Sequence, residues 1–309
     1  MGLTSKSKAK EIKKKNDQLK MNDYQQKIAQ EFQNSIDEFH RMNVNDDHEL
    51  DIKLLKDEIA QLTESNLRGT WNESLMTFSP SGASKCEREL WFKEIKAPQD
   101  EIVFEPYQKR WVRNGTYIHK AVQRDLVYME KYLPDCPFEV LKTKEGRFAW
   151  ERNTRTVTQL EHNGVEFQIY GMMDAVLWHK ETKKKIGFDL KTKSTTIASV
   201  GDYKLKVPQD NNVAQMVAYS LLFGIDDFLI PYESLAKDNW TKGKEARNDM
   251  KTFLIHVTPE MKAQLLDKFA RVAEQYYTGY NPAPEYSKCL FCSYKTSCDE
   301  LERGVFSLE

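Results

Sequence analysis

The segments GVEFQIYGMMDAVLWH (residues 164–179) and IGFDLKT (residues 186–192), joined by a lysine-rich turn, decide the fold. The first segment alternates in the manner of one strand or a pair of strands, and the second is typical of a further strand. A short turn between strands would bring Asp174 and Asp189 close together. Lys191 follows Asp189 by two positions, so that both side chains point to the same face of the predicted strand.

Two carboxylates in such a place suit Mg²⁺ or Mn²⁺, which prefer oxygen ligands. A divalent ion held there could activate a water molecule and bind a phosphate group. Lys191 could then orient the water or stabilise developing negative charge. The alternative is that these residues are ordinary solvent-facing charges at strand ends, and the pair alone does not separate the two interpretations.

Three further side chains could belong to the same site as the two aspartates. Gln215 and Tyr219 are four residues apart in a predicted helix over residues 211–223, and therefore share a face. His119 lies in a longer helical pattern over residues 107–133. An imidazole beside two carboxylates makes Mn²⁺ a suitable metal, although an isolated histidine is more often a surface or core residue.

The ordered set Gly115-x-x-x-His119, Gly171-x-x-Asp174, Asp189-x-Lys191 and Gln215-x-x-x-Tyr219 resembles the nuclease domain of the PD-(D/E)xK superfamily, in particular its RecB-like branch. The resemblance covers residues from about 70 to 300 and implies an α/β fold with a mixed central sheet flanked by helices. Met173 stands where the family name implies proline, and the second acid is Asp189 rather than glutamate. Neither departure removes a ligand.

This resemblance implies a metal-dependent DNA nuclease, foremost an exonuclease that hydrolyses DNA ends or single strands in replication, recombination or repair. His119, Asp174 and Asp189 would hold Mg²⁺ or Mn²⁺, while Lys191 works with the water and Gln215 and Tyr219 position DNA. Two alternatives remain open. The chain could be a DNA-end-binding module of a larger complex with weak or no cleavage, or it could be an endonuclease.

Four cysteines form a second constellation, with Cys289-x-x-Cys292-x5-Cys298 near the C-terminus and Cys86 far upstream. Four thiolates suit either zinc or an iron-sulfur cluster, and spacing alone does not choose. The arrangement resembles the iron-sulfur nucleases of the AddB and CRISPR-adaptation type, which implies a structural 4Fe-4S cluster with Zn²⁺ as the alternative. Cys136 fits no ligand pattern, and we interpret it as a free thiol.

The first 65 residues differ in charge from segment to segment. Residues 1–30 carry eight lysines against three acids, and residues 31–65 carry ten acids against three bases. We predict a basic mobile arm over residues 1–21, a helical hairpin over 22–65 and the nuclease domain over 66–309. In the hairpin, Ile28, Phe32, Ile36 and Phe39 recur at helical spacing, and so do Ile52, Leu55, Ile59 and Leu62.

The whole chain has a formal net charge of only −1, so that a DNA-binding surface must be a local patch. Lysines crowd the predicted catalytic strands and could bind phosphates, or could simply be solvated. Aromatic residues could stack on unpaired bases, although we expect most of them to lie in the core: Trp91, Phe92, Tyr107, Trp111 and Tyr203.

No segment approaches the roughly 20 apolar residues of a membrane span, and we expect a cytoplasmic protein. No G-x-x-x-x-G-K-[ST] phosphate loop is present either, so any processive unwinding would need a helicase or another DNA-processing protein as partner.

Overall fold

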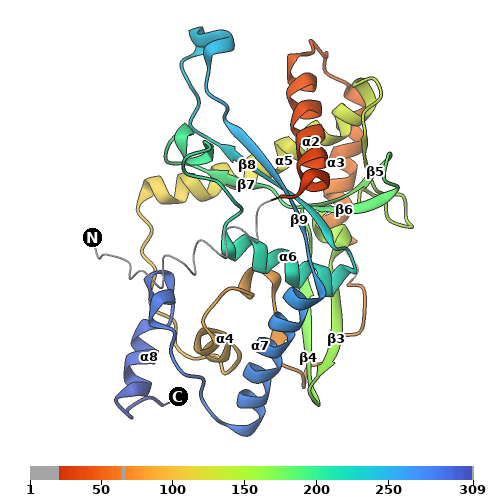
Figure 1. Ribbon diagram of the computed structural model, residues 1–309. Helices are drawn as coiled ribbons and strands as arrows, with labels where there is room; N and C mark the ends of the chain where they lie inside the picture. The colour runs from red at the N-terminus through yellow and green to blue at the C-terminus, as the bar shows by residue number, and fades with distance from the viewer. Residues whose placement is uncertain (1–20, 65–66, 308–309) are drawn as a thin grey trace.

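The computed structural model describes residues 21–64 and 67–307 (Figure 1). The predicted basic arm therefore lies outside the described residues, except for Met21. A mixed sheet has the strand order β2-β5-β6-β8-β7, and β9 pairs with the other edge of β8. Its strands are β2 (Phe138–Val140), β5 (Ala175–His179), β6 (Lys184–Phe188), β7 (Lys191–Lys193), β8 (Asp227–Ser234) and β9 (Met250–His256).

The central sheet is buried on both faces, as its alternation shows. On β5, Ala175 and Leu177 belong to one core while Val176 belongs to the other. On β9, Leu254 and its neighbour Phe253 divide in the same way, as period-two side chains must. Helices α2 (Asp23–Arg41) and α5 (Pro106–Tyr132) cover one face, and α6 (Asp210–Phe223) and α7 (Pro259–Thr278) cover the other (Figure 1).

The second predicted strand is interrupted at Asp189 and Leu190, where β6 ends and β7 has not begun. Both pieces run parallel to β8, with Phe188 opposite Leu229 and Lys191 opposite Tyr232. A Cβ on Gly187 would lie 2.3 Å from the ring of Phe228, so that only glycine allows the two strands this close. The strand pair expected from residues 164–179 is also present, but its members belong to different sheets.

The smaller sheet has the order β1-β4-β3, formed by β1 (Thr77–Phe78), β3 (Thr156–His162) and β4 (Val165–Gly171). Strands β3 and β4 are joined by Asn163 and Gly164, which both have positive φ angles, at 54° and 76°. Two such residues form the tight turn that suits the twist of antiparallel strands. Asp174 follows the end of β4 by three residues, at the passage from this sheet to β5.

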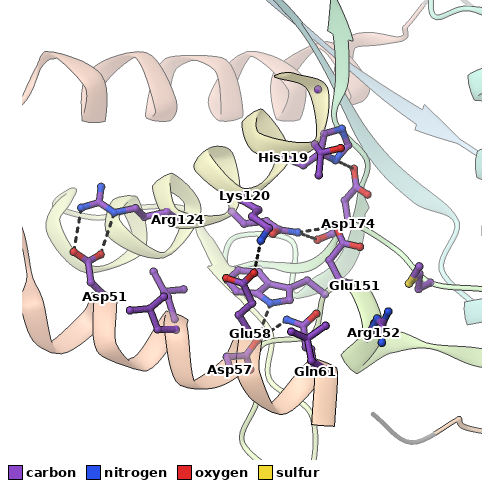
Figure 2. Close-up of a pocket in the computed structure, with 18 residues that line it drawn as sticks. Asp51, Asp57, Glu58, Gln61, His119, Lys120, Arg124, Glu151, Arg152 and Asp174 are labelled. Carbon is purple, nitrogen blue, oxygen red and sulfur yellow. Dashed lines mark hydrogen bonds and ion pairs between the residues drawn. The ribbon is translucent and has the colours of Figure 1, made fainter. Parts of the chain in front are cut away.

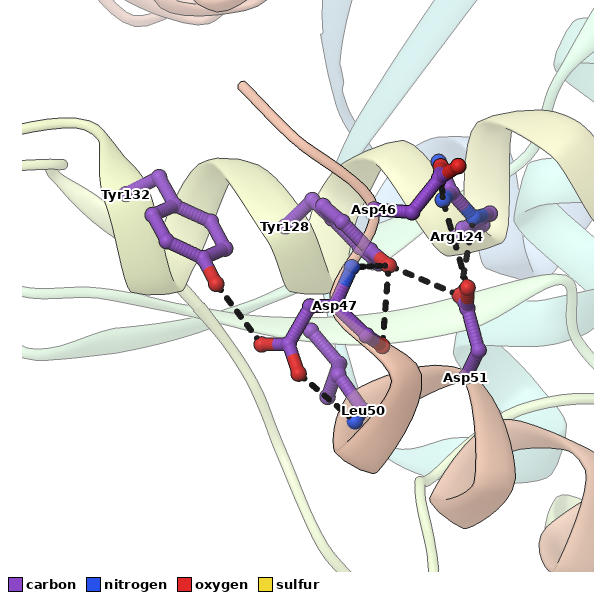
Figure 3. A network of polar contacts seen from close by, with 7 residues as sticks. All are labelled: Asp46, Asp47, Leu50, Asp51, Arg124, Tyr128 and Tyr132. Carbon is purple, nitrogen blue, oxygen red and sulfur yellow. Dashed lines mark hydrogen bonds and ion pairs between the residues drawn. The ribbon is translucent and has the colours of Figure 1, made fainter.

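Helix α3 (His48–Thr63) differs from what its sequence pattern led us to expect. Its apolar stripe is exposed, with Ile52 at 51% and Leu62 at 66% of their full accessibility, and Leu55 and Ile59 between them. The helix is instead fixed by polar contacts. Asp47 caps it by accepting from the Leu50 backbone N–H, and also accepts from the Tyr132 hydroxyl, while Tyr128 donates to Asp51 at 2.8 Å (Figure 3).

The C-terminal segment is helical in part. It contains a 3₁₀ helix, η5 (Tyr286–Phe291), and the helix α8 (Lys295–Glu302). Trp91 and Phe92 on α4 (Glu87–Glu94) are buried, but Tyr107, Trp111 and Tyr203 are exposed, so that the expectation of mostly buried aromatics was wrong for these three. No helix within the described ranges is long and apolar enough to cross a membrane.

Candidate active site

Three potential metal ligands converge where α5 passes the start of β5 (Figure 2). His119 lies in the middle of α5, Asp174 directly precedes β5, and Glu151 begins the 3₁₀ helix η2 (Glu151–Thr154). One ligand atom from each lies within 4.8 Å of the others. The Nδ1 atom of His119 is 3.0 Å from Oδ2 of Asp174, and Gln123 donates to both the Glu151 carboxylate and the Asp174 carbonyl.

The break between β6 and β7 brings the second acid and the lysine to the same place. The Nζ atom of Lys191 lies 2.5 Å from Oδ2 of Asp189, which is almost completely buried. The backbone N–H of Leu190, freed from strand pairing, donates to Oδ2 of Asp174 at 2.9 Å. The interrupted strand therefore connects the two aspartates directly.

The side chain of Gln215, on helix α6, contacts both Lys191 and Asp189. Lys191 donates to Oε1 of Gln215 at 2.9 Å, and the amide of Gln215 donates to the Tyr219 hydroxyl at 3.0 Å. A longer contact of 3.4 Å runs from the same amide to Oδ1 of Asp189. Tyr219 is buried, and its hydroxyl holds the Gln215 side chain in place.

Burial and neighbouring negative charge raise the pKa of two carboxylates of this site, Glu151 and Asp189. Burial, and then the charge of Asp174, raise the pKa of Glu151 to about 7. The same two causes raise the pKa of Asp189 to about 6, against the opposing charge of Lys191. Burial alone would lower the pKa of His119, but its hydrogen bond with Asp174 raises it overall. A cation bound among these groups would reduce the repulsion between their negative charges.

The scan against family models gives a match to the PD-(D/E)XK nuclease superfamily over residues 96–299, about two thirds of the chain. The chain belongs to the PD-(D/E)XK nuclease superfamily. Its mixed sheet flanked by helices agrees with that fold. The matched segment contains all six site residues predicted from the sequence, but neither α2 nor α3.

Two solved structures are similar to this PD-(D/E)XK chain at a distant level. The protein SSO0001 is 16% identical over 80% of this chain and 93% of its own, with a TM-score of 0.43. An alkaline exonuclease from Laribacter hongkongensis is 10% identical over 66% of this chain and 90% of its own, with a TM-score of 0.41. The search of curated proteins gave no match. The assignment rests on the family model.

The donor set of the PD-(D/E)XK site fits a divalent metal. PD-(D/E)XK nucleases use divalent metals, and the cluster offers carboxylate oxygens with one imidazole nitrogen. Asp189 is almost completely buried, and Nζ of Lys191 lies 2.5 Å from its Oδ2. A buried carboxylate close to further acids is costly to keep charged, and a divalent cation would lower that cost.

Glu151 is the site residue that sequence reasoning missed. It follows the apolar run Phe148-Ala149-Trp150, and an acid directly after buried residues was the available signal. Its position is set by a distant residue. Asp57 of α3 is buried and accepts hydrogen bonds from the Phe148 backbone, the Trp150 indole and the Asn153 amide.

A cleft of about 940 Å³ opens over the site in this nuclease chain. One wall is α5, and the other is α3, which lies outside the segment matched by the family (Figure 2). Ion pairs join the walls, from Lys120 to Glu58 and from Arg124 to Asp51. The acidic N-terminal segment therefore contributes directly to the surroundings of the active site.

The four predicted cluster cysteines surround a small cavity that shares no lining residue with this cleft: Cys86 before α4, Cys289 in η5, Cys292 after it and Cys298 in α8. Arg88 donates to the sulfur of Cys298, and the Glu285 backbone N–H donates to that of Cys86. Among the described residues, which include all five cysteines, no three sulfurs lie within 4.8 Å of one another. Zn–S bonds of about 2.3 Å would place tetrahedral sulfurs roughly 4 Å apart. Cys136 lies elsewhere, buried, and donates to the Phe138 carbonyl.

Proposed function

We propose that this chain is a metal-dependent DNA nuclease of the RecB-like branch, foremost an exonuclease acting on ends or single strands. The observation that carries the proposal is the convergence of His119, Glu151 and Asp174 beside the Asp189–Lys191 ion pair. The hydrogen bond from Lys191 to Gln215 supports the branch, because it joins the last two sequence motifs into one site.

In this proposal His119, Glu151, Asp174 and Asp189 hold Mg²⁺ or Mn²⁺. The bound ion would supply a water molecule of lowered pKa and a positive charge for the phosphate. Lys191, kept in place by Asp189 and Gln215, offers its ammonium group to the attacking water or to charge that develops on the phosphate. Gln215 positions Lys191, and Tyr219 positions Gln215.

The test uses linear and circular single-stranded DNA with Mg²⁺ or Mn²⁺. We expect cleavage of the linear strand, background activity in Asp174→Ala and Lys191→Ala, and full activity in the control Asp202→Ala, whose acid is exposed elsewhere. Retained cleavage in both active-site variants would refute the assignment. Cleavage of the circular strand would show an endonuclease, because only an internal cut opens a circle.

We further propose that Cys86, Cys289, Cys292 and Cys298 hold a structural 4Fe-4S cluster. The convergence of all four cysteines on one small cavity supports a common ligand, and the resemblance to the iron-sulfur nucleases favours the cluster over zinc. Protein purified without oxygen should contain about four irons per chain and absorb broadly near roughly 400 nm. Cys292→Ser should lose this absorption, while Cys136→Ser should keep it. About one zinc per chain and no colour would refute the cluster.

A role in replication, recombination or repair, with a helicase as partner, is consistent with such an activity. A strand opened by a partner protein would be a suitable substrate for a chain that has no phosphate-loop motif of its own.

A further inference from the structure

The first three turns of α5 extend away from the body of the protein with little packing around them (Figure 1). Nearly every side chain from Pro106 to Tyr117 is exposed, whereas Val122, Leu126 and Met129 on the same helix are buried. A helix that is half core and half uncovered needs a reason for its uncovered half, particularly when large apolar side chains lie on it.

Aromatic side chains lie along this uncovered part. Tyr107 and Trp111, one helical turn apart, form an edge-to-face pair with ring centroids 5.1 Å apart. Trp111 is 43% and Tyr117 is 64% exposed. Lysines accompany the rings, with Lys109 over Phe104 and Lys120 over Tyr117. This alternation of aromatic and basic side chains is typical of surfaces that bind unpaired nucleotides.

The charge of the same stretch is entirely positive. Residues 106–124 include five lysines and arginines and no acid, in a chain whose net charge is −1. Lys109, Arg113, Lys120 and Arg124 follow one another at intervals of four, seven and four residues, so they lie along one side of the helix. A row of this kind matches a chain of phosphates.

The two ends of this basic row differ in their partners. Near the active site, Lys120 and Arg124 pair with carboxylates of α3 (Figures 2 and 3). Farther out, Lys109 contacts the Phe104 ring and Arg113 donates to the Asn114 amide, and neither has a carboxylate partner among the described residues. The unneutralised half of the row is thus the half that carries Tyr107 and Trp111.

The helix also leads into the active site. Gly115, Thr116 and His119 line the cleft, and His119 is one of the proposed metal ligands. With a rise of about 1.5 Å per residue, Tyr107 lies roughly 18 Å from His119 along the helix, a span of several nucleotides. A strand bound along residues 106–117 would therefore have its next phosphates at the cleft.

We propose that residues 106–117 of α5 bind the unpaired part of a DNA strand and direct it into the cleft. The proposal rests on the proposed nuclease function and specifies its substrate as single-stranded. Exposed rings favour a single strand over a duplex, whose bases already stack on one another, and the acid-free charge favours nucleic acid over an apolar protein partner.

The test measures binding without cleavage, by fluorescence anisotropy of a labelled oligothymidylate in EDTA, with a blunt hairpin duplex as comparison. We expect Trp111→Ala to weaken single-strand binding about 10-fold, Trp111→Phe to retain most of the affinity, and duplex binding to change little. Arg113→Ala should reduce the slope of log affinity against log salt by about 0.7. Trp71→Ala is the matched control, because Trp71 is also 43% exposed but contacts Tyr170 of the other sheet.

Unchanged affinity in Trp111→Ala, or an equal loss in Trp71→Ala, would overturn the proposal. So would sedimentation showing a wild-type dimer that Trp111→Ala converts to a monomer, because the face would then be covered by a second copy. A cleavage assay distinguishes a failure of this binding proposal from a failure of the nuclease assignment. With metal, Trp111→Ala should raise KM and leave kcat unchanged, whereas a wild-type chain that does not cleave would refute the nuclease function and leave the binding result to stand.

Discussion

Glu151 combines a buried carboxylate with an uncommon backbone conformation. Its φ angle is +44°, a region that residues other than glycine seldom occupy, and its backbone N–H donates to the Met173 carbonyl at 2.7 Å. Departures of this kind gather at functional sites, where the surroundings hold them in place. Here the hydrogen bond fixes Glu151 to the residue that directly precedes Asp174.

Replacing this carboxylate should weaken the metal site. We expect Glu151→Gln to lower Mn²⁺ affinity by about 10- to 100-fold, the effect typical of residues that support or complete a metal site. Isothermal titration calorimetry measures the change directly. The exposed acid of β3 provides the control, and Glu161→Gln should bind Mn²⁺ like the wild type; equal affinity in both variants would remove Glu151 from the ligand set.

The raised pKa of Glu151 predicts a pH-dependent stability. With a pKa of about 7 in the folded chain against an ordinary 4.5, Glu151 binds more protons when folded, so the free energy of unfolding falls as pH rises through this window. Metal-free wild-type protein should therefore lose thermal stability between pH 5 and about pH 7 relative to Glu151→Gln. Saturating Mn²⁺ should abolish the difference, and a parallel pH profile in the two proteins would contradict it.

Local spacing was sufficient to predict most residues of the candidate site. Asp189 and Lys191 are two residues apart, and Gln215 and Tyr219 are four apart, so each pair is fixed by its own strand end or helix. Glu151 could not be found in this way. Its position depends on the tie from Asp57 to the segment around Trp150, more than 90 residues away in sequence.

Among the elements, α3 is fastened by a single buried carboxylate more than by its apolar side chains. Removing Asp57 would leave the donors of Phe148, Trp150 and Asn153 buried and unpaired. We expect Asp57→Ala to reduce the free energy of unfolding by about 2–4 kcal/mol in urea titrations. The exposed ion pair between Glu58 and Lys120 gives the comparison. Glu58→Ala should change the free energy of unfolding by no more than about 0.5 kcal/mol. Similar values for both would show that the buried contacts do not anchor the helix.

We propose that the main domain needs helix α2 in order to fold. Ile28, Phe32, Ile36 and Phe39 are buried, and the helix packs on β9 and α5. At about 1.5–3 kcal/mol for each side chain, their removal would forfeit roughly 6–12 kcal/mol, comparable with the whole stability of a typical domain. A chain truncated to begin at residue 67 should therefore aggregate on expression. A soluble, cooperatively folding fragment, observed by circular dichroism and sedimentation, would show instead that the segment is an appendage.

Regular periodicity allowed the long helices to be predicted, and departures from it account for the errors. Helix α5, Pro106–Tyr132, agrees within one residue at each end with the helix predicted over residues 107–133. Helix α3 shows the same kind of stripe, yet its Leu55 and Ile59 face solvent, because burial is decided by which other elements lie nearby. The break at Asp189 is likewise invisible in the sequence, since it follows from how β6 and β7 share β8.

At the scale of the whole molecule, the proposed cluster joins segments that are about 200 residues apart. Cys86 precedes α4, whereas Cys298 lies in α8, and Arg88 also bridges the two by pairing with Glu302. A cross-link over so long a loop restricts the unfolded chain, and metal binding energy is gained only when the ligands are assembled. We expect Cys298→Ser to lower the Tm by at least several degrees, measured by calorimetry without oxygen. Cys136→Ser should change it less, and equal shifts would argue against a cluster at these four cysteines.

Strand β8 sets the positions of both β6 and β7, the strands on either side of Asp189, because each of them pairs with β8 in a parallel register. The positions of Asp189 and Lys191 are consequently insulated from the β5–β6 turn at residues 180–183, which lies at the opposite end of its hairpin. This matters for engineering the protein. A fluorophore or a peptide tag inserted into that turn would be tethered to the catalytic strand while leaving its working end untouched, which makes the turn a suitable attachment point for following the enzyme on DNA one molecule at a time.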